Sequence, residues 1–227
     1  MFLERGIEVL TGAVLLGIFV SLVVFISVGI DIDTDVDNFR GSLEDIVGNR
    51  TRYFVSYSFS ILGNFLIVAA AALTYLLFRD YDRNLAMLGA FALVAAGATL
   101  MAANAMALAL EPLAQDVSAA VGPQRDTLLS SARSFALASE WGNFVGVTFI
   151  GLSVLSLGAL IVWSKPVPGL LGWLGIGGGI LMVLIWLVAI SDTLFVIPLI
   201  GLIAVGVWLL VVGTWLIKHG VTIRSLW

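Results

Sequence analysis

The sequence predicts an all-α integral membrane protein, folded as a bundle of six transmembrane helices. Six long apolar stretches occupy most of the 227 residues, so little chain is left for a soluble domain. Hydrophobic residues make up 60% of the chain and charged residues 11%, whereas a soluble domain carries about 25% charged residues. Helices suit this composition because each one satisfies its backbone hydrogen bonds within a single segment, as the bilayer requires.

The six apolar stretches are long enough to cross the hydrocarbon core, for which a helix needs about 20 residues. The first stretch is longer than the ~7–15-residue apolar region of a signal peptide, so we interpret it as a retained span. The charged turn at 79–83 is short, and spans two and three should therefore be antiparallel neighbours. The whole chain, 1–227, forms one transmembrane domain with spans at about 7–30, 53–78, 85–110, 137–163, 169–190 and 195–217.

Two further helical features are expected outside the hydrocarbon. In the outer loop at about 31–52, Phe39, Leu43 and Ile46 recur at helical spacing between charged residues. This pattern favours a short amphipathic helix on the membrane surface. A loop at 113–122 is expected to lead to Pro123, a residue suited to the first turn of a helix. One extended helix should begin there and continue as the fourth span.

Charge and composition limit the location and the chemistry. The short turns at 79–83 and 165–168 are basic, which predicts a multi-pass plasma-membrane protein with both termini in the cytoplasm. The chain lacks cysteine and has one histidine, His219, so thiolate chemistry and sites that need two histidines are excluded. The net charge of -4 does not suit a nucleic-acid partner. No catalytic residue, cofactor or metal site is predicted.

Two residue patterns resemble functional motifs without meeting their requirements. Asp31, Asp33, Asp35 and Asp37 alternate as in part of a calcium loop, but the glycine and glutamate that an EF-hand needs later in the loop are missing. We expect a solvated acidic loop. The glycines within 175–179 do not follow a strand and are not followed by Lys-Ser or Lys-Thr, so they do not form a phosphate loop. They should instead permit close helix packing or a kink.

Spans four and five carry a recognisable pattern of small residues. The stretch from Trp141 to Leu152 reads Trp-Gly-Asn-Phe-Val-Gly-Val-Thr-Phe-Ile-Gly-Leu, and it is followed by Leu157-Gly158 and by Pro168-Gly-Leu-Leu-Gly172. With the turn Arg83-Asn-Leu-Ala86, these motifs resemble the uncharacterised membrane family called domain of unknown function 4386, over about residues 5–220. The resemblance implies an outer loop after the first span, a long fourth helix and a proline turn before the fifth. It implies no chemistry, and Gly169 stands where the family often has a basic residue.

Five polar residues could line a cavity that faces the outer side. Arg133 and Glu140 are seven residues apart, as are Asn104 and Glu111, so each pair shares one helix face. Ionisable groups near hydrocarbon are costly and usually face the bundle or water. The alternative is that the charged residues are interfacial anchors and that Asn104 makes an interhelical hydrogen bond. The candidate polar cavity comprises Glu140, Arg133, Glu111, Asn104 and Asn143.

The second span carries an approximate stripe of small and polar residues. Such stripes usually make close helix contacts, and a substrate path is the alternative. The stripe consists of Ser56, Ser60, Gly63, Asn64 and Thr74.

Three functions remain compatible with these observations. The first is a non-enzymatic accessory or structural subunit that packs against membrane lipid, a membrane-protein partner or another copy of itself. The second is a small-solute or cation/proton transporter that uses the outer carboxylates. The third is an intramembrane lipid-modifying enzyme.

Overall fold

The computed structural model describes residues 2–29 and 38–221, and throughout these ranges the regular structure is helical. Six of the helical segments are long and apolar enough to cross a membrane, which confirms the predicted all-α membrane fold. The acidic alternation from Asp31 to Asp37 lies outside the described residues. The helices are α1 (Phe2–Val28), α2 (Phe39–Gly48), α3 (Arg50–Phe78), α4 (Arg83–Leu108), α5 (Leu110–Ala119), α6 (Pro123–Ser164), α7 (Gly169–Val183) and α8 (Val196–Lys218), with 3-10 turns η1 (Leu184–Ala189) and η2 (Asp192–Phe195).

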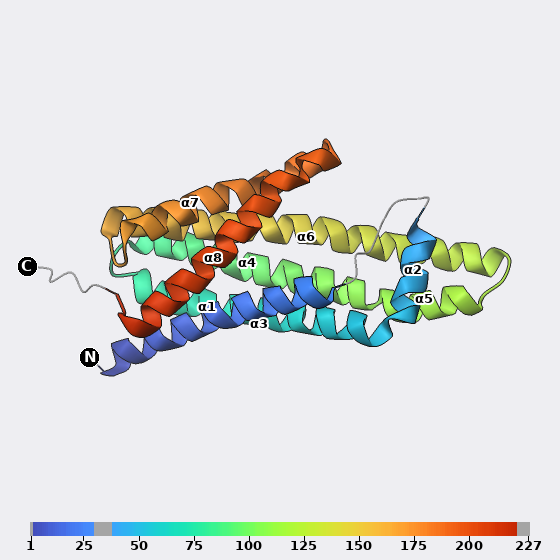
Figure 1. Cartoon of the computed structure of the whole chain (residues 1–227), viewed down its shortest axis with the longest axis horizontal. Helices are drawn as coiled ribbons and strands as arrows, with labels where there is room; N and C mark the ends of the chain where they lie inside the picture. Colours follow the sequence, from blue (N-terminus) through green and yellow to red (C-terminus); the bar gives the residue numbers. More distant parts are fainter. Residues whose placement is uncertain (1, 30–37, 222–227) are drawn as a thin grey trace, which may run out of the picture.

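The six spanning helices form a closed ring. α1 packs against α3, α3 against α4, α4 against α6, α6 against α7, α7 against α8, and α8 returns to α1. In the elongated bundle α8 crosses α1 obliquely, and the start of α1 and the end of α8 lie at the same end of the molecule (Figure 1). In this cyclic order, one face of every spanning helix is directed toward a central space.

A second apolar cluster forms a cap at the end of the bundle opposite the termini (Figure 1). We define the cap as α2, α5 and residues 123–139 of α6. With 42 residues, α6 is about 63 Å long at 1.5 Å per residue, about twice the thickness of the hydrocarbon core. The extended fourth helix therefore projects beyond the membrane, and the cap packs around its projecting part.

The cap differs from the sequence-based expectation in two ways. The region expected as a loop at 113–122 is mostly helical, because Pro112 lies in the first turn of α5, where a helix tolerates proline. The apolar face of α2 was expected to lie on the membrane surface. Instead Phe39, Leu43 and Ile46 are buried in the cap cluster with residues of α3, α5 and α6, so this face is covered by protein.

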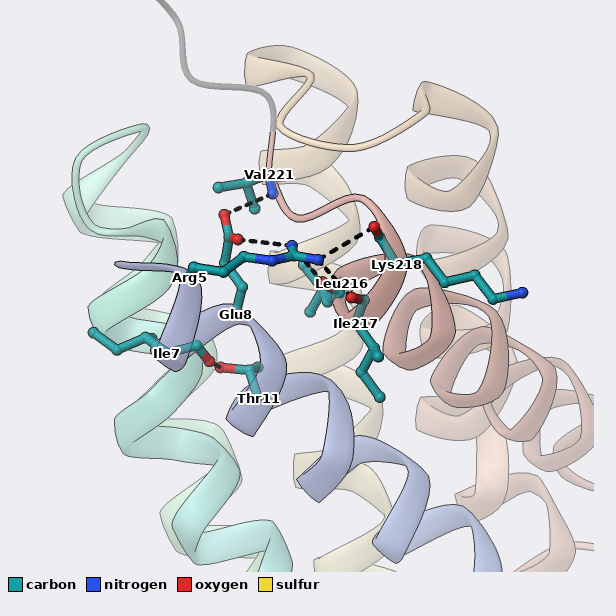
Figure 2. A network of polar contacts seen from close by, with 8 residues as sticks. All are labelled: Arg5, Ile7, Glu8, Thr11, Leu216, Ile217, Lys218 and Val221. Atoms are coloured by element: carbon teal, nitrogen blue, oxygen red, sulfur yellow. Dashed lines mark hydrogen bonds and ion pairs between the residues drawn. The ribbon is translucent and has the colours of Figure 1, made fainter. Parts of the chain in front are cut away.

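At the opposite end, a polar network that we call the terminal clasp joins the two ends of the chain (Figure 2). The guanidinium of Arg5 donates hydrogen bonds to the carbonyls of Leu216 (3.2 Å), Ile217 (2.6 Å) and Lys218 (3.2 Å). It also forms an ion pair with Glu8 at 3.0 Å. The last carbonyls of a helix lack partners within the helix, so Arg5 caps α8.

The clasp also holds the chain just beyond α8. Glu8 accepts a hydrogen bond from the backbone N–H of Val221 at 2.9 Å. Gly220 precedes it with a φ of 73°, the left-handed conformation that commonly ends a helix and that glycine adopts without strain. Residues at the start of the first span therefore determine the position of the chain after the last span.

Candidate functional site

The ring of spanning helices encloses a cavity of about 300 Å³. Side chains from α1, α3, α4, α6, α7 and α8 line it, and most are aliphatic. None of the lining residues carries a charge. The polar lining residues are Ser21, Ser60, Asn64, Asn104, Asn143 and Ser153.

The amide side chains gather toward the cap. Asn104 on α4 donates a hydrogen bond from Nδ2 to Oγ of Ser60 on α3 at 2.7 Å. Asn64 lies one helical turn from Ser60 on the same face of α3. Its side chain is buried, with 5% exposed, and its Nδ2 lacks a hydrogen-bond partner among the described groups. Asn143 on α6 is at the same level, because the neighbouring Gly142 packs against α4 one residue from Asn104.

The cavity becomes apolar toward the termini. Its lining there includes Leu157 on α6 together with Val205, Trp208 and Leu209 on α8. The indole N–H of Trp208 donates to the carbonyl of Leu171 at 2.9 Å, so the polar atom of this ring is already engaged. The cavity thus has an amide end near the cap and a hydrocarbon-like end deep in the bundle.

The cavity reaches the surface of the bundle beside α1. Ile26, near the cap end of α1, lines the cavity and is also 59% exposed. Leu22 on α1 and Leu202 on α8 line the same part of the cavity and are half-buried. A molecule dissolved in the bilayer could therefore enter sideways, close to the amide end.

The structure separates the five polar residues proposed from the sequence. Asn104 and Asn143 line the cavity, together with Asn64 and Ser60 from the stripe on the second span. Glu111, Arg133 and Glu140 do not line it.

The three charged candidates lie toward the cap. Glu111 is largely buried, forms an ion pair with Arg50 at 2.6 Å between Oε1 and Nε, and accepts a hydrogen bond from Gln115. Arg133 and Glu140 are half-buried on α6, and both interact with other groups. The carboxylates therefore belong to the base of the cap, whereas the amides belong to the cavity.

Sequence reasoning missed the aliphatic majority of the lining. In the sequence, these aliphatic residues are marked only by their position in an apolar span. Residues that face lipid and residues that face the core share this property. Asn64 and Ser60 did carry a signal, because a polar stripe on an apolar helix points toward other helices rather than toward lipid.

Comparison with known proteins assigns the chain to a family. No curated protein and no solved structure matches the chain. The family model described as "Domain of unknown function (DUF4386)" matches residues 10–220, which include every residue that lines the cavity, whereas Arg5, Glu8 and Val221 of the terminal clasp lie outside this range. The match confirms the resemblance seen in spans four and five: this multi-pass membrane protein belongs to the DUF4386 family.

Proposed function

We propose that the protein is a non-enzymatic membrane protein that binds a lipid-like small molecule inside its ring of helices, as an accessory subunit in the membrane. The observation that supports this function is the cavity of about 300 Å³ with a predominantly aliphatic lining. Small-molecule sites have volumes of about 300–1,000 Å³ and combine an apolar lining with a few placed polar groups. The described cavity fits both criteria.

The volume sets the size of the ligand. An engineered apolar cavity of about 150 Å³ holds benzene, so a cavity twice as large accommodates roughly ten to twelve non-hydrogen atoms. This corresponds to a medium-length hydrocarbon chain or to the end of a longer one that extends out past Ile26.

Filling the cavity should abolish binding. Ala70 on α3 lines the cavity and is fully buried, so Ala70→Phe places a ring in the ligand's space. We expect a photoreactive diazirine analogue of dodecane to label the wild type saturably at cavity residues in lipid nanodiscs, and to lose this labelling in the variant. Thermal unfolding of the same samples shows whether the variant is folded, and Ala70→Leu provides a smaller obstruction if it is not.

The matched control is the preceding alanine of the same helix. Ala69 is exposed on the outer face of α3, so Ala69→Phe adds the same ring outside the cavity and should leave labelling unchanged. Labelling that is unsaturable in the wild type, or that survives a folded Ala70→Phe variant, would refute the proposed binding function.

Transport of a small solute is the second candidate, and one observation favours it: Asn104 and Asn143 line the same cavity. Coupling to protons would have to use Glu140 or Glu111, which lie outside the lining. Proton-coupled flux into proteoliposomes that Glu140→Gln abolishes would favour transport, whereas saturable binding without flux favours the accessory function.

We infer that the termini lie in the cytoplasm and the cap outside the plasma membrane, and the basic short turns support this orientation. Because the chain lacks cysteine, single introduced cysteines can test this orientation. Val121, between α5 and α6, is 84% exposed, and Val121→Cys should react with a membrane-impermeant maleimide in intact cells. Lys165→Cys, at the exposed turn between α6 and α7, should react only after permeabilisation. The reverse pattern would place the cap in the cytoplasm.

A further inference from the structure

We propose that the cavity selects an uncharged amphiphile whose hydrogen-bond acceptor, a carbonyl oxygen in a ketone or ester, is bound by the side-chain N–H group of Asn64. This inference rests on the proposed binding function and specifies the ligand class. The acceptor would lie at the amide end of the cavity, and the hydrocarbon chain would extend toward Trp208.

The unused donor on Asn64 is the first argument. A buried amide without a partner is costly, and the bilayer core provides little water to satisfy it. Ser60 and Asn104, one turn away, are bonded to each other at 2.7 Å. Asn64 therefore carries a donor that its neighbours leave unused, and the residue is one of those that line the cavity.

The uncharged lining is the second argument. None of the lining residues is acidic, basic or histidine. A carboxylate or phosphate inside the cavity would be a buried charge without a counter-ion, which is far more costly than a buried neutral group. The residues favour a neutral carbonyl over an anionic headgroup.

The arrangement of polar and apolar groups is the third argument. The amides lie at the end nearer the cap, next to the opening at Ile26, and the aliphatic lining continues inward to Leu157 and Leu209. At that inner end the indole N–H of Trp208 is bonded to the Leu171 carbonyl. A chain can therefore enter the inner end without burying a free donor, and its carbonyl remains near the opening.

Two radiolabelled probes of equal length test this selection. 2-Dodecanone and dodecane differ mainly by one carbonyl, and binding to protein-containing nanodiscs is corrected with empty nanodiscs. We expect the wild type to bind the ketone about fivefold more tightly, as one net hydrogen bond provides. In Asn64→Leu the preference should disappear while dodecane binding persists. Asn84→Leu, at an exposed asparagine of α4, should retain the preference.

The outcomes separate the two proposals. If neither probe binds, the binding function itself fails. If both bind equally to the wild type, or if Asn64→Leu retains the preference, the function stands and the assignment of Asn64 is wrong. Tighter binding of dodecanoate than of 2-dodecanone at pH 8 would overturn the uncharged ligand class.

Two further measurements complete the test. Without ligand, Asn64→Leu should unfold at a temperature no lower than the wild type, because leucine removes an unsatisfied amide; a misfolded variant would contradict this account of the site. Nanodiscs of ether-linked lipids identify the source of the carbonyl. More free sites for 2-dodecanone in ether lipids than in ester lipids would mean that bilayer acyl esters occupy the cavity, and equal numbers would mean a free small molecule.

Discussion

Gly158→Leu is expected to separate α7 from α6 and to lower the free energy of unfolding by about 3 kcal/mol or more, the upper part of the range for overpacked cores. A Cβ atom at Gly158 would lie 2.8 Å from both the carbonyl oxygen of Gly172 and the backbone nitrogen of Ile176. Both obstacles are backbone atoms of α7, so no side-chain rotation relieves the clash and the helices must move apart.

The contact between α6 and α7 is reciprocal, and this makes the effect large. A Cβ at Gly172 would lie 2.7 Å from the carbonyl oxygen of Gly158, and Gly151 and Gly179 repeat the arrangement toward the cap. Helices in a bilayer associate through close van der Waals packing rather than a hydrophobic driving force, so small residues at such contacts are decisive. Separation of α7 would also open the ring and should abolish labelling of the cavity.

The control for this prediction is a glycine in the same region without a neighbour. Nothing lies within 4 Å of a Cβ built on Gly177, so Gly177→Leu should leave the unfolding temperature unchanged or raise it slightly through higher helix propensity. Reversible unfolding in mixed micelles by titration with SDS measures both variants. Equal destabilisation of the two would show that backbone clash is not the cause.

These glycines show how far the sequence could predict the packing. The run at 175–179 indicated close packing, and Gly175, Gly178 and Gly179 do approach neighbouring helices, whereas Gly177 does not. Which of these glycines pack closely depends on which helices flank α7. The flanking helices follow from the cyclic order of the bundle, and this order includes contacts between α1 and α8 that no local sequence pattern encodes. The number of spans could be predicted because each one is a long apolar stretch in the sequence.

The cavity was only partly predictable for a related reason. Asn104 was proposed because it lies seven residues before Glu111 on the same helix face, and it does line the cavity. Glu111 was placed beside it by extending the same helix face, but the helix is interrupted at Ala109 and Glu111 pairs with Arg50 at the base of the cap. A face extrapolated across a helix break loses its direction, and Pro112 marks this break, because it has no N–H to donate to the carbonyl of Leu108 four residues earlier.

Arg5→Ala is expected to release the end of α8 and to lower the free energy of unfolding by about 2 kcal/mol. Hydrogen bonds from charged groups contribute about 1.5–3 kcal/mol each when buried, but the side chain of Arg5 is 43% exposed, so solvent screening reduces their sum. Glu8 is only 10% exposed and would lose its cation; a carboxylate left unpaired in a poorly solvated position adds to the loss.

Proteolysis can detect the release directly. Lys218 precedes His219, whereas the other lysine, Lys165, precedes a proline that hinders cleavage. A lysine-specific protease should therefore remove the residues after Lys218 several times faster in Arg5→Ala than in the wild type. Arg5→Lys should restore the ion pair with Glu8 but not the contacts to three carbonyls, because an ammonium lacks the planar fork of donors. Its cleavage rate should be intermediate.

Arg40→Ala is the matched control, because Arg40 also pairs with a glutamate but on an open surface. Its partner Glu44 lies one turn away on α2, and the two side chains are 61% and 66% exposed, so loss of the pair should cost less than about 0.5 kcal/mol. Glu8→Gln on the wild-type and Arg5→Ala backgrounds completes a double-mutant cycle. A coupling energy near zero, with unchanged cleavage after Lys218, would mean that α8 is held by its apolar contacts with α1 alone. A coupling above about 1 kcal/mol, together with faster cleavage after Lys218 in Arg5→Ala, would show that the Arg5–Glu8 pair of α1 helps to hold the end of α8.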